Sequence, residues 1–262
     1  MPTTLERILA STRASLPPLH ARRSEIEASA LRAPAPPPFL SCWDRNRVAL
    51  IAEVKRRSPS AGAISEELDP VKHAATYARS GASAVSVLTD GPHFGGSLKD
   101  LSSVTAAVRI PTLRKDFILD QLQIAEARAA GASAVLLIVR ALPPARLVEL
   151  LGVARATGLE ALVEVHGARE LDAALEAGAR IIGVNSRNLD DFRIDIAAAW
   201  ALIARIPRDT VAIAESGMAS EGDVRRAAEA GADGVLIGTA LSGSANPAGL
   251  VAAVSAVART GR

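Results

Sequence analysis

The sequence contains little cysteine and few aromatic residues. Its 262 residues include one cysteine, Cys42, which excludes an intrachain disulfide and a cysteine-based metal site and fits a reducing cytoplasm. Aromatic side chains make up only 3% of the chain, too few for the stacking platforms that bind nucleic-acid bases. The 30 basic residues nearly balance 28 acidic ones, and no Lys/Arg block stands out. We therefore expect no binding of nucleic acid.

Long apolar runs are also missing. No stretch reaches the roughly 18 apolar residues of a membrane-spanning helix, and residues 1–23 contain no continuous apolar segment of a signal peptide. Glu6 interrupts the Arg- and Ser-rich start, which otherwise has the composition of a transit peptide. We therefore expect a cytoplasmic protein without membrane contact.

Lysine is rare as well. Of the 30 basic residues, four are lysines and the other 26 are arginines. Because arginine serves at most positions that need a positive charge, a retained lysine indicates a task that arginine cannot perform. The four lysines are Lys55, Lys72, Lys99 and Lys115.

The first 46 residues differ in composition from the rest. Two short helical patterns, near 3–14 and 20–32, precede the proline-rich stretch APAPPP, which indicates an extended linker. We predict an N-terminal helical extension and linker over residues 1–46, and a catalytic domain over 47–262. Cys42 and Trp43 are expected to pack the extension onto this domain.

From Val48 onward, short apolar runs alternate with helical segments. The spacing leaves room for one crossover helix between successive strands. The runs are apolar almost throughout, as expected when both faces of a parallel sheet are covered. The predicted strands span residues 48–54, 84–88, 111–115, 134–139, 160–165, 181–185, 211–215 and 234–238.

A repeated Gly-Ala motif supports a barrel. Four related segments, which begin at Ser80, Ala130, Ala177 and Ala230, place glycine at a helix end just before a strand, where it can adopt a left-handed conformation. Eight strand–helix units in a chain of this length favour an α/β fold, a (β/α)8 TIM barrel with an N-terminal helical extension, over a doubly wound open sheet. The active site of such a barrel lies at the carboxyl ends of its strands.

Polar side chains end several of these apolar strands, and two of the four lysines are among them. Acids and bases held close in a cleft are how enzymes separate pKa values, although a structural ring of ion pairs is an alternative. No histidine spacing suggests a metal site, and His166 is expected at the rim. The strand-end residues are Glu53, Lys55, Lys115, Glu164, Asn185 and Arg187.

Glycine-containing turns follow the last two strands. Ser216 and Gly217 come after the seventh strand, and Gly238 and Thr239 after the eighth. Backbone N–H groups and hydroxyls in these two places commonly bind phosphate in barrels. Ser58, in the loop after the first strand, adds a hydroxyl.

The chain resembles the indole-3-glycerol phosphate synthase family in segments that span the barrel. The combination of E-x-K-x-x-S-P-S after the first strand with K-D-F after the third is the most specific part. Thr239 and Asn188 stand where the family commonly has serine and aspartate. The matching segments are IAEVKRRSPSAG (51–62), SVLTDGPHFGGS (86–97), LRKDFILDQLQI (113–124), LVEVH (162–166), IGVNSRNLDDF (182–192), AESG (214–217) and GVLIGTAL (234–241).

The resemblance implies conversion of 1-(2-carboxyphenylamino)-1-deoxyribulose 5-phosphate to indole-3-glycerol phosphate, with loss of carbon dioxide and water. It makes Lys115 the general acid of ring closure. Because a nearby cation lowers the pKa of a lysine, we expect Lys55 to be the neighbour that lowers the pKa of Lys115. Lys55 binds the substrate carboxylate or is a second acid. Glu164 and Glu53 orient the lysines, and one of them supplies the base.

The resemblance also implies the remaining contacts with this small phosphorylated substrate. It implies no metal and no cofactor, because the cationic intermediate is its own electron sink, and we expect a monomer or a weak homo-oligomer. For the aryl slot, ordinary core packing is the alternative. Asn185 and Arg187 position the substrate; Ser58, Ser216, Gly217, Gly238 and Thr239 hold its phosphate; Phe94, Phe117, Leu136 and Leu189 line the aryl slot.

Two other functions are compatible with a phosphate-binding barrel. One is a sugar-rearranging enzyme such as phosphoribosylanthranilate isomerase, whose chemistry does not require two strand-end lysines. The other is an inactive barrel that binds phosphometabolites or partners, which an intact set of charged strand ends disfavours.

Overall fold

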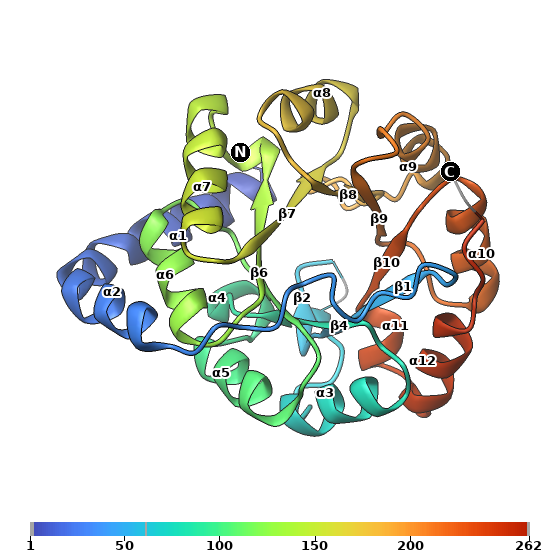
Figure 1. Cartoon of the computed structure of the whole chain (residues 1–262), viewed down its shortest axis with the longest axis horizontal. Coiled ribbons are helices and arrows are strands. Elements are labelled where there is room, and N and C mark those ends of the chain that lie inside the picture. Colours follow the sequence, from blue (N-terminus) through green and yellow to red (C-terminus); the bar gives the residue numbers. More distant parts are fainter. Residues whose placement is uncertain (1–2, 61, 261–262) are drawn as a thin grey trace.

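The computed structural model describes residues 3–60 and 62–260 (Figure 1). The predicted extension, the predicted catalytic domain and the segment 51–62 each include at least one residue outside these ranges. All eight predicted strands are present, with each end within one residue of the prediction. They run parallel and close into a barrel, because β1 pairs with both β4 and β10. The strands are β1 (Ala49–Val54), β4 (Ala84–Leu88), β5 (Thr112–Lys115), β6 (Ala134–Ile138), β7 (Glu160–Val165), β8 (Ile181–Asn185), β9 (Val211–Glu215) and β10 (Gly234–Ile237).

An outer ring of helices covers the barrel (Figure 1). Several of these helices begin at a capping side chain, such as Asp69, Ser97, Asp120 or Ser220, that accepts a hydrogen bond from a backbone N–H of the first turn. Short helical turns, α4 (Gly91–Phe94), η1 (Val139–Ala141) and α11 (Thr239–Ser242), follow three of the strands. The ring helices are α3 (Pro70–Arg79), α5 (Leu98–Ala107), α6 (Gln121–Ala129), α7 (Pro144–Ala156), α8 (Ala168–Glu176), α9 (Ile196–Ile203), α10 (Glu221–Glu229) and α12 (Pro247–Ser255).

The glycines of the repeated motif have the predicted left-handed backbone. Gly81, Gly131, Gly178 and Gly231 have φ values of 107°, 83°, 79° and 101°. Each ends a helix and turns the chain back toward the next strand, so an L side chain at these positions would be strained. The repeat is therefore a repeat of helix–strand turns.

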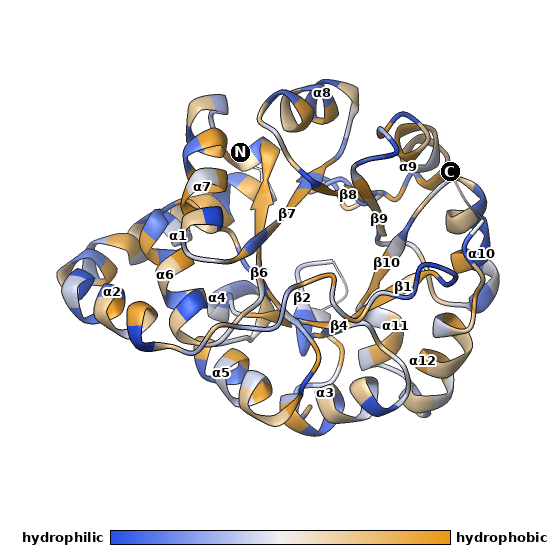
Figure 2. Cartoon of the chain, viewed as in Figure 1, coloured by the Kyte–Doolittle hydropathy of each residue, from blue (hydrophilic) through white to orange (hydrophobic). Residues whose placement is uncertain are grey.

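Two apolar layers form the core. The larger layer lies between strands and helices, and the hydropathy colouring of Figure 2 shows the strands as mostly hydrophobic. The second fills the barrel interior with side chains from alternate strand positions, including Ile51, Leu113, Leu162, Ile213 and Leu236. This interior is a packed layer on which the polar strand ends rest.

The N-terminal segment forms two helices against the ring. Leu5, Ile8 and Leu9 of α1 (Thr4–Ala21) belong to the same apolar cluster as the barrel interior, and Ile26 of α2 (Arg23–Arg32) packs with Ala125 of α6. The first helix is longer than predicted, because it continues through Pro17 and Pro18.

The loop after β1 contains a short hairpin that was not predicted. It consists of β2 (Arg57–Ser58) and β3 (Gly62–Ala63), which are antiparallel. Two-residue strands are too short to show an alternating pattern in sequence. Trp43 is partly buried against the barrel interior, but Cys42 is exposed, so the expectation that Cys42 packs the extension was wrong.

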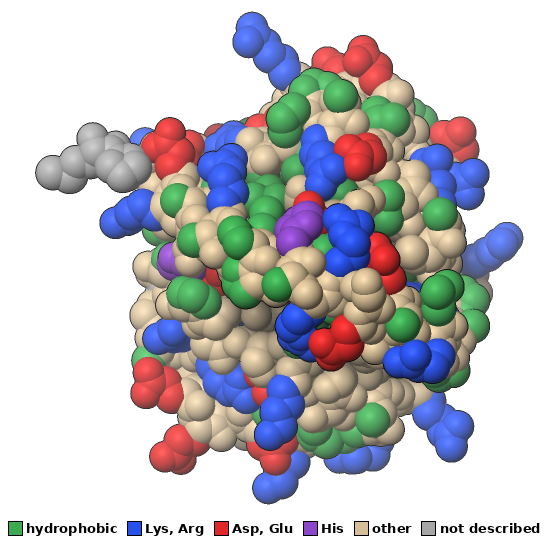
Figure 3. Space-filling view, turned by 90° about the vertical axis from the view of Figure 1, so that its left-hand side faces the viewer, with side chains coloured by type: hydrophobic (Ala, Val, Ile, Leu, Met, Phe, Trp, Pro, Cys, Tyr) green, Lys and Arg blue, Asp and Glu red, His purple; other side chains and the backbone are tan. Residues whose placement is uncertain are grey.

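The molecular surface is mixed in charge. Figure 3 shows Lys and Arg side chains interspersed with Asp and Glu over one face. Among the helices of the described part of the chain, none combines the length and apolar character that crossing a membrane requires.

Candidate active site

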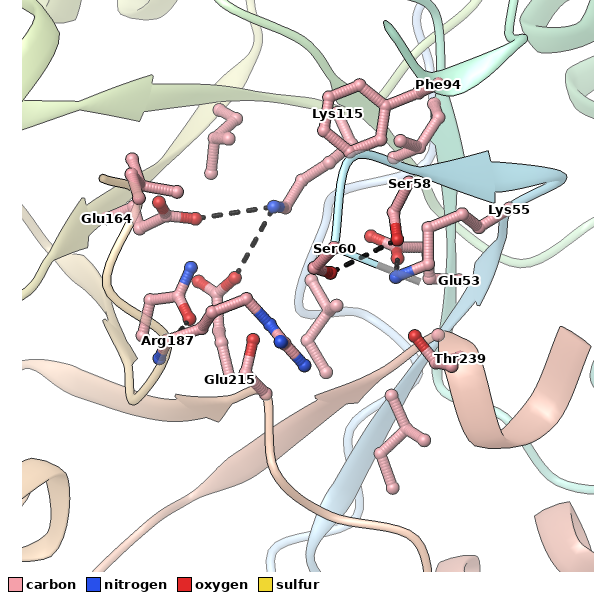
Figure 4. A pocket seen from close by; sticks show the side chains of 18 of the residues that line it. Glu53, Lys55, Ser58, Ser60, Phe94, Lys115, Glu164, Arg187, Glu215 and Thr239 are labelled. Carbon is pink, nitrogen blue, oxygen red and sulfur yellow. Dashed lines mark hydrogen bonds and ion pairs between the residues drawn. The ribbon is translucent and has the colours of Figure 1, made fainter. Parts of the chain in front are cut away.

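A cavity of about 440 Å³ opens where the strands end. All of the residues predicted for the site line it, and Figure 4 shows the labelled side chains projecting into it from several strands. They are Glu53, Lys55, Ser58, Phe94, Lys115, Phe117, Leu136, Glu164, Asn185, Arg187, Leu189, Ser216, Gly217, Gly238 and Thr239.

Strand geometry explains why the charged residues meet there. Side chains two positions apart on a strand share one face. Lys115 therefore follows the interior residue Leu113, and Glu164 follows Leu162, so that each charged group lies one layer above an apolar one. The apolar layer below closes the cavity and supports the charges above it.

Lys115 lies between two buried carboxylates. Its Nζ is 3.3 Å from Glu164 Oε2 and 3.7 Å from Glu215 Oε2, and the two glutamate side chains are 1% and 2% exposed (Figure 4). Burial alone lowers the pKa of Lys115, but Glu164, Glu215 and Glu53 outweigh it and hold this pKa above its ordinary value. These carboxylates therefore stabilise the ammonium form of Lys115.

This arrangement corrects the expected role of Lys55 as a neighbour that lowers the pKa of Lys115. Lys55 Nζ instead pairs with Glu53 Oε1 at 3.0 Å. The pKa of Lys115 is raised rather than lowered, because carboxylates and not another ammonium dominate its surroundings. The cavity holds two lysine–glutamate clusters.

Glu215 is a site residue that the sequence analysis did not select. Burial and repulsion from Glu164 raise its pKa to about 8, in spite of the opposing effect of Lys115. Gly183 on β8 leaves the space for it, since a Cβ there would overlap the Glu215 carboxylate. The strand pattern could have identified Glu215. It ends β9 two residues after the interior residue Ile213, just as Glu164 follows the interior residue Leu162 on β7.

Glu53 and Lys55 are held by the neighbouring βα turn. The hydroxyl of Ser242 donates to the carbonyl of Glu53 at 3.1 Å and accepts from the backbone N–H of Lys55 at 3.1 Å. A Cβ at Gly238 would overlap the Glu53 carboxylate, so this position needs glycine. The turn after β10 thus also shapes the end of β1.

The two turns predicted to hold phosphate lie on one side of the cavity. Ser216 and Gly217 have φ values of 66° and 73°, a left-handed pair that is unusual for serine. Gly238 precedes α11, which begins at Thr239. The Ser58 hydroxyl is 3.3 Å from that of Ser60, a further residue of the lining.

The predicted aryl slot forms an apolar wall of the cavity. The rings of Phe94 and Phe117 are 6.1 Å apart and tilted by 36°. Phe94 is positioned by Asp90, whose side chain accepts hydrogen bonds from the backbone N–H groups of His93 and Phe94. Leu136 and Phe117 also belong to the interior cluster, so they are at once core and wall.

His166 is not at the rim, as we expected, but buried beside Glu164. Its side chain is 3% exposed, with Nε2 3.4 Å from Glu164 Oε1 and Nδ1 3.2 Å from Glu170 Oε2.

On β8, the Asn185 side chain accepts from the backbone N–H of Arg187 at 3.0 Å, and burial lowers the pKa of Arg187.

The residues that the structure describes include no group of three or more His, Cys, Asp or Glu side chains placed to hold a metal ion. What the cavity offers is two ammonium groups, three strand-end carboxylates, hydroxyl-bearing turns and an apolar wall. That combination suits acid–base chemistry on an anionic substrate with an apolar part.

Comparisons with known proteins agree in one family. A sequence model of the family described as "Indole-3-glycerol phosphate synthase" matches residues 5–254. The indole-3-glycerol phosphate synthase of Opitutus terrae is 46% identical over 261 residues, which cover 96% of this chain and 98% of that protein. The enzyme of the same name from Chlorobium luteolum is 52% identical over 209 residues, 80% of each chain.

Solved structures with lower identity share the fold alone. A 3-hexulose-6-phosphate synthase superposes with a TM-score of 0.63 at 17% identity, over 80% of this chain and 99% of that one. A thiamine phosphate pyrophosphorylase from Pyrococcus furiosus gives 0.61 at 17% identity, over 80% and 95%. Both are similar to this chain in fold.

Proposed function

The chain belongs to the indole-3-glycerol phosphate synthase family, carboxy-lyases of tryptophan biosynthesis, and we propose how its cavity performs that reaction. The substrate is 1-(2-carboxyphenylamino)-1-deoxyribulose 5-phosphate and the product indole-3-glycerol phosphate. The observation that carries the assignment of roles is the buried contact of Lys115 with Glu164 and Glu215, opposite the pair of Lys55 and Glu53.

Binding orients the substrate across the cavity. Its phosphate lies between the Ser216-Gly217 turn and the turn at Gly238-Thr239, near Ser58. Its aryl ring lies against the wall formed by Phe94, Phe117, Leu136 and Leu189. Asn185 and Arg187, at the end of β8, position the part of the substrate that joins the phosphate to the aryl ring. Lys55 provides a positive charge in addition to that of Lys115.

Lys115 protonates the ketone oxygen while the ring carbon attacks the ketone carbon. Carbon dioxide then leaves, and its bonding electrons restore the aromatic ring. Glu215 assists, because burial and repulsion from Glu164 raise its pKa, and each time it takes up a proton it removes one negative charge that holds the proton on Lys115. Lys55 then protonates the new hydroxyl, which leaves as water, and Glu164 accepts the ring proton that is lost as the indole forms.

The test is direct. Purified protein is mixed with the synthase substrate, and indole fluorescence reports product. A folded protein that binds the substrate but forms no indole would favour an inactive phosphometabolite-binding barrel instead.

We also propose that residues 1–46 are an extension of a catalytic barrel at 47–262. The proposal is supported by the element order, because all eight barrel strands follow residue 48 and residues 3–46 form two helices and no barrel strand. A cytoplasmic location and a monomeric or weakly associating state stay predictions from the sequence.

A further inference from the structure

The His166 side chain fills the space behind Glu164, on the side away from Lys115. One imidazole nitrogen faces Glu164 Oε1 at 3.4 Å, while Lys115 contacts the other oxygen, Oε2, at 3.3 Å. Among the described residues, His166 is not part of the cavity lining, so it does not contact a bound substrate directly.

His166 is itself held by the carboxylate of Glu170. Glu170 Oε2 is 3.2 Å from its Nδ1 and accepts the backbone N–H of the same residue at 2.8 Å. Glu170 Oε1 accepts from Arg140 Nε at 2.9 Å. Burial raises the pKa of Glu170, but the contacts with His166 and Arg140 outweigh it and lower this pKa to about 2. A permanent anion therefore orients the imidazole from behind.

The need for such a partner follows from the reaction. A buried carboxylate is costly unless it is paired, and Glu164 loses the positive charge of its partner Lys115 whenever that lysine donates its proton. The other groups that face Glu164 are the carboxylate of Glu215 and the side-chain amide of Asn185. His166 is the remaining neighbour able to carry positive charge at this carboxylate, within the part of the chain that the structure describes.

We propose that His166 is a positioning residue, which holds the Glu164 carboxylate in place and keeps it charged while Lys115 is without its proton. The proposal rests on the role assigned to Glu164 above. Glu170 holds the imidazole of His166, and Arg140 in turn holds the carboxylate of Glu170, so the arrangement extends outward from Glu164.

The experiment compares His166→Leu with His166→Gln, whose amide N–H keeps a polar group facing Glu164. For His166→Leu we expect kcat to fall roughly 10- to 100-fold, because small misplacements of a reacting group cost about that much, with KM within about threefold. The acid limb of the kcat profile should move to higher pH, since the loss of His166 removes a group that lowers the pKa of Glu164. His166→Gln should recover most of kcat. His73→Gln on α3, at a histidine outside the cavity lining, is the matched control.

A double variant separates this role from a structural one. In the Glu164→Gln background, His166→Leu should lower kcat no further, because it acts through Glu164. The proposal is overturned if His166→Leu leaves kcat and the acid limb unchanged, or if its loss persists undiminished in that background. If Glu164→Gln itself keeps near-normal turnover, the assigned role of Glu164 fails instead.

Should His166→Leu not fold, Glu170→Gln provides the second test. It keeps an acceptor for the backbone N–H of His166 but removes the charge behind the imidazole. We expect a shift of the acid limb in the same direction, and an unchanged profile would overturn the proposal.

Discussion

At the scale of single residues, the cavity distinguishes lysine from arginine. Lys115 fits its ammonium between Glu164 on β7 and Glu215 on β9, 3.3 and 3.7 Å away. An ammonium is a compact point charge, whereas a guanidinium is a planar fork that needs more room. In a chain that otherwise uses arginine freely, this site explains why a lysine is kept.

Lys115→Arg tests that explanation. Arginine would satisfy an ion pair but holds its proton too tightly to be a general acid, since its pKa exceeds about 12. We expect kcat to fall at least roughly a hundredfold, with a smaller change in KM and an unchanged circular dichroism spectrum. Lys72→Arg, at an exposed lysine, is the control. A kcat within about tenfold of the parent would favour the ion-pair role.

Glu164→Gln keeps the shape of the side chain and removes its charge and basicity. Because general acid–base groups contribute roughly 10²–10⁴ in rate, we expect a loss of kcat in that range while the protein folds normally. Steady-state indole formation measures the loss of kcat, and thermal unfolding shows whether the variant folds normally. Near-normal turnover would show that Glu164 is only structural.

Glu215 should affect the pH dependence of stability. Its pKa is raised from 4.5 to about 8, so the folded state binds a proton that the unfolded state has released between these values. Uptake of this proton stabilises the folded state. The stabilisation is fully present below the unfolded-state pKa of 4.5 and is lost as pH rises through the folded-state pKa of about 8. Glu215→Gln removes it, so the Tm of the variant relative to the parent should rise between about pH 5 and 8. Parallel Tm curves would contradict the assignment.

At the scale of elements, the strands could be predicted because each is an apolar run that is buried on both faces. The strand ends also identified Glu53, Lys55, Lys115 and Glu164 as a site, since parallel strands place their carboxyl ends together. The partners within the site could not be read from the sequence. Which lysine meets which glutamate depends on barrel register and side-chain direction, so the sequence left these pairs open, and the expectation that Lys55 lowers the pKa of Lys115 was wrong.

The turns after β9 and β10 carry the predicted phosphate site. Thr239→Val keeps the shape of the side chain and removes its hydroxyl. Loss of a hydrogen bond to a charged group costs roughly 1.5–3 kcal/mol, which corresponds to at least about tenfold in affinity. We expect KM to rise about tenfold with little change in kcat. The control is Thr76→Val on α3, a partly exposed residue outside the cavity lining, which should have no effect. A product complex with its phosphate elsewhere would overturn the prediction, as would an unchanged KM.

At the scale of the whole molecule, the N-terminal helices bridge the core and the candidate site. Leu5, Ile8 and Leu9 share an apolar cluster with Phe117, a residue of the cavity wall, whereas Ile26 packs on α6 away from it. The barrel strands close without any of these residues. The extension therefore supports the shape of the aryl wall more than the closure of the barrel.

Deletion of residues 1–32 should accordingly weaken substrate binding more than it unfolds the barrel. We expect a cooperative thermal transition at lower temperature, because burial of a large apolar side chain contributes roughly 1.5–3 kcal/mol, together with a raised KM. Two point variants separate the effects. Ile8→Ala should raise KM more than Ile26→Ala, although both remove a buried side chain and should lower Tm by similar amounts. If the truncated chain has no cooperative transition, the extension is part of the folding core. If the two point variants change KM equally, the link from α1 to the cavity wall is absent.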